Sequence, residues 1–192
     1  VWTDESERDI LEETGTHVTH CPSSNMKLAS GVAPVWDYLD RGINVALGND
    51  GPPCNNTLDP FTEMRQASLL QKVDQLDPTV TPAGDIFEMA TLNGAKAAGF
   101  EELGAIREGW RADIVGLSTD LTRGTPLHDV LSHLVFAAHG DDVQFTMVDG
   151  TVLQEDGEVT AIDADAVRRE ASEIGLRMDL TEERQSARQQ KP

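Results

Sequence analysis

Two short β-forming runs, separated by one helix-length segment, constrain the fold of this chain more than any other feature. The runs are HVTHC at 17–21 and NVAL at 44–47, and each leads into a loop rich in Pro, Ser, Gly or Asn. The segment between them, 30–42, contains apolar residues at helical spacing and ends at a glycine. Strands joined by a helical crossover pair in parallel, so the sequence predicts a βαβ unit and an α/β fold.

Further helices are expected on both sides of this unit. Asp4 and Glu7 have the spacing of a capping box, and Gly15 is a suitable end for the helix that they open. Asp59 followed by Pro60 predicts the start of a long helix that runs to about residue 73. Another helix is expected over 84–98.

The second half of the chain has a different texture. From residue 104 onward, short apolar stretches alternate with polar ones, and two Asp-Gly pairs at 149–150 and 156–157 predict tight turns between antiparallel strands. A final amphipathic helix is expected over 163–178, followed by a polar, frayed tail at 184–192. No internal repeat is evident.

Charge and composition exclude several classes of partner. The net charge is −19, with 34 acidic and 15 basic residues, which argues against binding to nucleic acid or to an anionic membrane. No apolar run approaches the length of a membrane span, and the acidic start predicts no secretion signal. Two cysteines do not make a disulfide framework, so a cytoplasmic location is expected. Only 4 of the basic residues are Lys, and this acidic, lysine-poor composition suggests a halophilic source over an ordinary acidic protein.

Two candidate functional residues follow the two predicted strands. His20 ends the first strand and Asp50 comes just after the second, and active-site groups of parallel α/β folds gather at this end of the strands. A carboxylate there could bind a divalent metal or act as a general base. Equally, Asp50 could be a simple turn residue, and His20 is more often a packed core residue in such a position.

The remaining cysteines and histidines give weaker signals. Cys21 and Cys54 are expected to be small buried residues rather than nucleophiles. His128, His133 and His139 match no HxH or HExxH spacing, so a metal site is not expected there.

Several ordered motifs resemble the amidohydrolase superfamily, specifically its branch of cyclic-amidine deaminases and chlorohydrolases. The branch includes methylthioadenosine, S-adenosylhomocysteine and 5′-deoxyadenosine deaminases. Its pattern H-x-P-x-S-N-x-K-L-x-x-G is followed by a strand ending L-G-[ST]-D-G, by [SC]-N-N and by E-M-R. The matching residues are His20, Pro22, Ser24, Asn25, Lys27, Leu28 and Gly31, then 47–51, 54–56 and 63–65. The stretches 89–99, 103–118 and 147–159 are also similar to this family.

The resemblance implies a metal-dependent (β/α)8 TIM barrel with a composite β-sandwich, of which this chain would be the C-terminal part. Residues 1–102 would be the last strands and helices of the barrel, 103–162 the sandwich portion, and 163–192 the C-terminal helix and tail. By resemblance, Asp50 would bind Zn²⁺ or Fe²⁺ and relay a proton from the activated water to the leaving amine. His20 and Asn55 would line the substrate pocket, without ligating the metal.

Two departures from the family pattern qualify the expectation. Asn49 stands where the family has Ser or Thr, a small polar change with little expected effect. The HxH pair and two further histidine ligands of the family are expected upstream of Val1. The chain alone is therefore expected to be inactive, with activity residing in a longer parent protein.

The predicted activity is hydrolysis of a carbon–nitrogen bond: metal-dependent deamination of a purine nucleoside-like or related cyclic amidine. Two alternatives stay open, a chlorohydrolase of the same family and a non-catalytic barrel remnant or scaffold subunit. The expected partner is a small heterocyclic substrate, and assembly into a homo-oligomer is left open.

Overall fold

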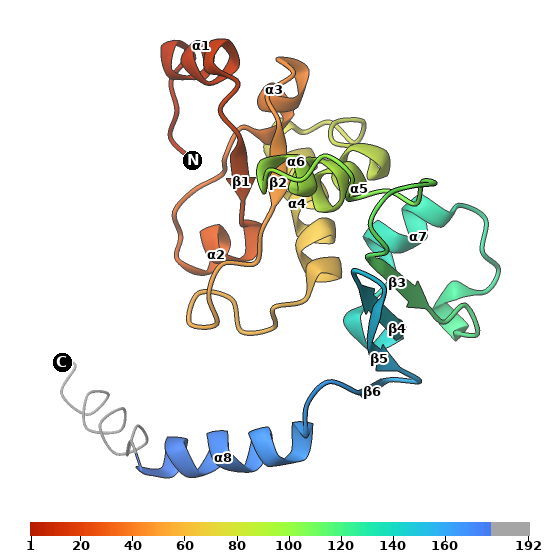
Figure 1. Cartoon of the computed structure of the whole chain (residues 1–192). Coiled ribbons are helices and arrows are strands. Elements are labelled where there is room, and N and C mark those ends of the chain that lie inside the picture. Colours follow the sequence, from red (N-terminus) through yellow and green to blue (C-terminus); the bar gives the residue numbers. More distant parts are fainter. Residues whose placement is uncertain (178–192) are drawn as a thin grey trace.

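The computed structural model describes residues 1–177, and its first half is the predicted βαβ unit surrounded by helices (Figure 1). Strands β1 and β2 pair in parallel, with Val18 opposite Val45 and His20 opposite Leu47. The elements of this half are α1 (Glu5–Thr14), β1 (Val18–His20), α2 (Pro22–Lys27), α3 (Val35–Asp40), β2 (Val45–Leu47), α4 (Pro60–Gln75), α5 (Ala83–Ala90) and α6 (Leu92–Ala97).

The core lies between β2 and the helices that cover one face of the strand pair. Val45 of β2 is fully buried against a cluster that includes Tyr38 of α3, Met64 of α4 and Ile86 of α5. Alternation along the strands places His20 and Leu47 on the same side as Val18 and Val45. The opposite side carries Thr19, which is exposed.

The second half is the predicted antiparallel meander, and its strands form one sheet in the order β3-β4-β5-β6. Both Asp-Gly pairs are turns with positive φ at both residues, as type I′ turns require. The elements are β3 (Ile114–Leu117), η1 (Thr122–Gly124), α7 (Val130–Phe136), η2 (Gly140–Asp142), β4 (Val143–Val148), β5 (Thr151–Glu155), β6 (Glu158–Val159) and α8 (Ala164–Arg177).

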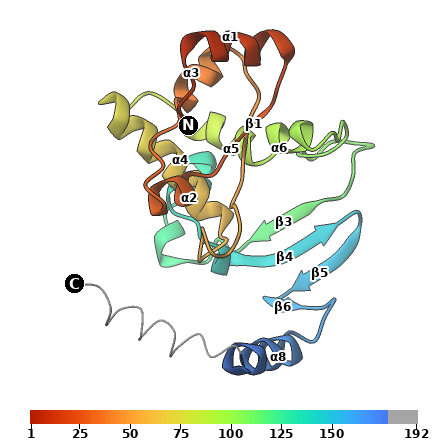
Figure 2. The same ribbon diagram turned by 90° about the vertical axis from the view of Figure 1, so that its left-hand side faces the viewer.

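The two halves are joined through α7, which packs on α4 and α5 and contributes Val135 to the common core. The sheet lies beside the α/β half, and α8 lies beyond β6 in both views (Figures 1 and 2). The proposed boundaries at 102/103 and 162/163 stay predictions. The predicted frayed tail lies outside the described residues.

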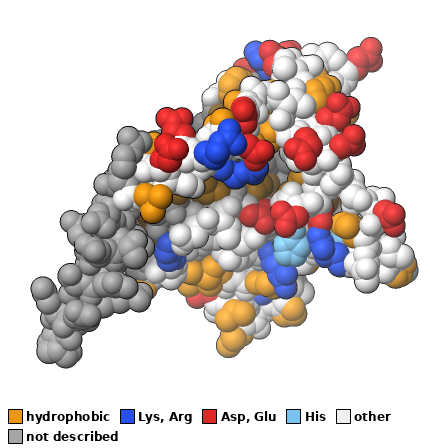
Figure 3. All heavy atoms as spheres, turned by 90° about the horizontal axis from the view of Figure 1, so that it is seen from below, with side chains coloured by type: hydrophobic (Ala, Val, Ile, Leu, Met, Phe, Trp, Pro, Cys, Tyr) orange, Lys and Arg blue, Asp and Glu red, His pale blue; other side chains and the backbone are white. Residues whose placement is uncertain are grey.

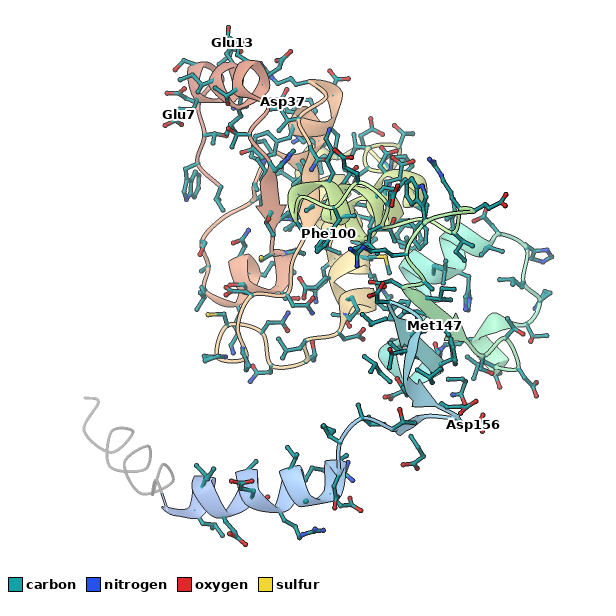
Figure 4. The ribbon with its side chains drawn as sticks, viewed as in Figure 1. Glu7, Glu13, Asp37, Phe100, Met147 and Asp156 are labelled. Carbon is teal, nitrogen blue, oxygen red and sulfur yellow. The ribbon has the colours of Figure 1, made fainter. Side chains whose placement is uncertain are left out.

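The surface reflects the acidic composition of the chain. On the face seen in Figure 3, acidic side chains form several clusters among basic and hydrophobic ones. On another part of the surface, Asp37 of α3 faces α1, where it accepts hydrogen bonds from Arg8 (2.7 Å) and Arg41 (3.2 Å) (Figure 4). Arg41 also pairs with Asp9 at 2.6 Å, so charged contacts hold the first helix against the third. Within residues 1–177, no helix combines the length and apolarity that a membrane crossing demands.

Candidate functional site

Asp50 lies immediately beyond the carboxyl end of β2, in a left-handed conformation with φ of +59°. Its Oδ2 accepts a hydrogen bond of 2.6 Å from the hydroxyl of Ser24, and its Oδ1 accepts one of 2.7 Å from the amide of Gly51. These two bonds, first that from Ser24, lower the pKa of Asp50. The carboxylate is solvent-exposed and stays ionised at neutral pH, as a metal ligand or a proton acceptor must.

Ser24 reaches Asp50 because the chain turns into the short helix α2 directly after β1. Proline at the first position of α2 suits the start of a helix, and Ser24 is almost completely buried. Figure 1 shows α2 and the loop after β2 at the same end of the strand pair. Lys27 at the end of α2 donates to the carbonyl of Pro53 (2.7 Å) and to Oδ1 of Asn56 (2.6 Å). Helix α2, which follows the first strand, therefore holds the loop that follows the second strand.

Asn55 is buried at the centre of this second loop and fixes its shape. Its Oδ1 accepts from the amides of Thr57 (3.2 Å) and Leu58 (3.3 Å), while its Nδ2 donates to the carbonyl of Asn49 at 2.9 Å. In this structure the side chain of Asn55 is engaged with its own loop. Its predicted role in the substrate pocket stays a prediction.

Glu63 of α4 lies beside these loop residues, although the sequence analysis did not single it out. It is fully buried and accepts hydrogen bonds from the backbone amide of Ser23 (3.1 Å), the hydroxyl of Ser23 and Nδ2 of Asn55 (2.7 Å). The hydroxyl of Ser23 also contacts Oε1 of Gln66. Glu63 is part of the E-M-R motif, which was the available signal, although the motif alone assigned it no role.

His20 is 2% exposed, and neither of its ring nitrogens has a hydrogen-bond partner among residues 1–177. Burial lowers its pKa to about 4, so the ring is neutral at physiological pH. Its strand face is shared with the core residues Val18 and Val45, so the structure packs the ring on the side covered by helices. Whether His20 lines the substrate pocket stays a prediction.

The remaining candidates are not brought together. Cys21 and Cys54 are both free thiols, and burial raises the pKa of Cys21, which disfavours a nucleophilic thiolate. Among the described residues, no group of three or more His, Cys, Asp or Glu side chains could hold a metal ion, His128, His133 and His139 included.

Gly48 allows the two strands to approach closely at the start of the Asp50 loop. A Cβ at this position would lie 2.8 Å from Cγ2 of Thr19 and 3.1 Å from Sγ of Cys21. We expect Gly48→Ala to lower the free energy of unfolding by about 1–3 kcal/mol through overpacking. Adding Thr19→Ser removes the nearer methyl group and should restore part of the loss. Urea denaturation of the two variants measures this, and equal losses would contradict the steric explanation.

The residues present fit one part of a divalent metal site. Asp50 offers an exposed, ionised oxygen ligand, of the kind that zinc and other divalent ions accept. Further ligands are needed beyond this one, because a catalytic zinc normally takes three from the protein.

Comparison with known proteins agrees with the motifs. The model of the amidohydrolase family matches residues 1–153. The chain is 50% identical over 173 residues to a 5-methylthioadenosine/S-adenosylhomocysteine deaminase of Haloarcula marismortui, covering 90% of this chain and 40% of that protein. It is 52% identical over 163 residues to a 5′-deoxyadenosine deaminase of Methanothermobacter thermautotrophicus, covering 85% of this chain and 38% of the relative.

Solved structures give the same assignment. A zinc-bound adenosine deaminase from Xanthomonas campestris superposes with a TM-score of 0.89 at 36% identity, over 91% of this chain and 40% of that one. Atrazine chlorohydrolase from Arthrobacter aurescens, complexed with zinc, superposes with a TM-score of 0.80 at 26% identity, over 90% and 38% of the two chains.

The chain therefore belongs to the amidohydrolase family, and the expected fold class, part of a (β/α)8 barrel with part of a β-sandwich, is confirmed. It spans about 40% of the length of the curated relatives that it matches.

Proposed function

We propose that this chain forms part of a metal-dependent hydrolase that deaminates a purine nucleoside-like substrate. The observation that carries the proposal is the ionised Asp50 at the carboxyl end of β2, fixed by Ser24. The identity to deaminases of adenosine derivatives supports it. The activity belongs to a polypeptide as long as these relatives, because the further metal ligands are not among the described residues.

In the proposed reaction, the carboxylate of Asp50 would hold the metal and would also move a proton. A bound Zn²⁺ or Fe²⁺ would supply Lewis-acid activation of the attacking water. Asp50 then accepts the proton that the water releases and passes it to the amino group as that group leaves. Ser24 holds the carboxylate in one orientation throughout. We propose Asn55 and His20 as residues that shape the pocket around it.

A chlorohydrolase is the second candidate, since the same attack on a ring carbon can displace chloride. The superposition on atrazine chlorohydrolase supports this candidate, although the identity there is 26% against 36% for the adenosine deaminase. The third candidate is a non-catalytic scaffold, which is left open because residues 1–192 contain no HxH pair.

The proposal is tested by assaying the full-length, zinc-loaded protein for release of ammonia from 5′-deoxyadenosine, methylthioadenosine and S-adenosylhomocysteine. We expect turnover of at least one of them. Release of chloride from atrazine without any ammonia from the nucleosides would favour the chlorohydrolase. No turnover by a folded, zinc-containing protein on either set would support the scaffold.

We also propose a cytoplasmic, high-salt setting for the protein. The net charge of −19 and the excess of Arg over Lys support this setting, because salt screens the repulsion between like charges. The free energy of unfolding should therefore rise when KCl is raised from about 0.1 M, where charges interact over roughly 10 Å, to about 1 M, where they do so over roughly 3 Å. Denaturation at the two concentrations measures this, and equal stability would contradict a halophilic origin.

A further inference from the structure

The hydrogen bond between Ser24 and Asp50 is braced on both sides by the buried carboxylate of Glu63. On one side, Glu63 accepts from the backbone amide and the hydroxyl of Ser23, the residue immediately before Ser24. On the other side, it accepts from Asn55, whose same amide nitrogen donates to the carbonyl of Asn49, the residue immediately before Asp50. One carboxylate thus links the residues that precede the donor and the acceptor.

Glu63 is so deeply buried that its carboxylate requires hydrogen-bond donors from the protein. It is 0% exposed and comes from the first turn of α4, a helix that Asp59 caps at its N-terminus. A buried carboxylate is costly unless it is hydrogen-bonded, and this one accepts from three donors, two on Ser23 of α2 and one on Asn55 of the loop after β2. Helix α2 and the loop after β2 are therefore held to α4, and through it to the core that contains Met64.

Asp50 needs such a brace because its own conformation is uncommon. A residue other than glycine at φ of +59° is held there by its surroundings, although aspartate tolerates this region better than most residues. The carboxylate is exposed, so packing of its own side chain does not fix its direction. The direction comes from Ser24, from the amide of Gly51 and from the backbone at Asn49. Glu63 holds the residues next to the first and the last of these three points.

We infer that Glu63 is a positioning residue for Asp50, which sets the direction of the metal-binding carboxylate through Ser23 and Asn55 without touching substrate or metal. The inference rests on the proposed function of Asp50. Residues that orient metal ligands in this way typically contribute 10- to 100-fold to metal affinity or activity.

The test is Glu63→Gln in the full-length protein, with zinc affinity measured by chelator competition and deamination measured as kcat and KM. Glutamine keeps the size of the side chain but replaces one acceptor oxygen with an NH2 group. That group is itself a donor and would face the donors of Ser23 or Asn55. We expect zinc binding about 10- to 100-fold weaker and kcat about 10- to 100-fold lower, with KM within about twofold of wild type. Glu88→Gln makes the same change at an exposed position of α5 and should leave all three unchanged.

A double variant separates positioning from a general structural effect. If Glu63 acts through Asp50, then Glu63→Gln added to Asp50→Asn should cause no further loss of kcat or of zinc affinity. Ser23→Ala removes the hydroxyl donor on one side of the brace and keeps the amide donor, and Asn55→Ala removes the donor on the other side. Each should give a smaller loss, which keeps the test available if Glu63→Gln does not fold.

Three outcomes would overturn the inference. They are a lower melting temperature for Glu63→Gln with unchanged zinc affinity and kcat, multiplicative losses in the double variant, and no loss in either single-side variant. A failure of the role proposed for Asp50 would look different, because Asp50→Asn itself would then have the kcat and the zinc affinity of the wild type.

Discussion

Asp50→Asn should lower kcat/KM for deamination by about 1000-fold in the full-length protein, which corresponds to about 4 kcal/mol of transition-state stabilisation. Asparagine removes the charge that holds the metal and the basic oxygen that takes up the proton, and general acid–base catalysis alone typically contributes 10²- to 10⁴-fold. The fold should survive, since asparagine tolerates positive φ and can still accept from Ser24. Steady-state kinetics and metal analysis of the purified variant measure both effects.

The chain provides a matched control for this variant. Asp156 also precedes a glycine and has φ of +51°, but it lies in the exposed turn between β5 and β6 (Figure 4). Asp156→Asn should leave kcat/KM and zinc content unchanged. Wild-type turnover and full zinc occupancy in Asp50→Asn would remove the role assigned to Asp50.

Acidification should destabilise the protein through His20. The pKa of His20 is lowered to about 4 by burial, whereas the unfolded chain binds the proton near 6.5, so the unfolded state holds more protons between these values. Stability is therefore complete above pH 6.5 and falls as the pH drops toward 4, by about 3 kcal/mol from this residue. Urea denaturation at pH 7 and at about pH 4.5 measures the loss.

His20→Gln should remove this part of the pH dependence, because glutamine does not titrate in the range. His17→Gln is the control, since it makes the same substitution three residues earlier, at an exposed position. An unchanged slope in His20→Gln would show that other groups, such as the many carboxylates, account for the acid sensitivity.

Local signals predicted most of the elements correctly. The capping box of Asp4 and Glu7, the cap at Asp59 and the two Asp-Gly turns all appear where the sequence placed them. Each of these signals depends on residues at most three positions apart. Such short-range chemistry can be recognised without knowing the rest of the fold.

The errors came where local signals were weak or misleading. The helix expected over 84–98 is two helices, α5 and α6, because Thr91 departs from helical geometry with φ of −127° and ψ of −92°. Neither Gly nor Pro marks that break. The short helix α2 was missed because its PSSN sequence has the composition of a loop, and α7 was missed within a segment interpreted as β-rich.

The site was only partly predictable for a related reason. His20 and Asp50 were singled out as candidates by their places at strand ends, and Asn55 by the motif resemblance. The role of Glu63 depends on contacts with Ser23, which is 40 positions away in sequence. The complete burial of this glutamate could not be read from the sequence of α4, in which polar residues such as Ser68 and Gln71 are buried as well.

The three Asp-Gly pairs of this chain have a consequence for anyone who wishes to graft the site onto another scaffold. Asp50, Asp149 and Asp156 all have φ between +49° and +59°, but Gly51 does not share the positive φ of Gly150 and Gly157. Only Asp50 has a serine at 2.6 Å, supplied from 26 positions earlier. A transplant of residues 48–51 alone would reproduce a turn. A transplant that aims the carboxylate would need α2 and Glu63 as well.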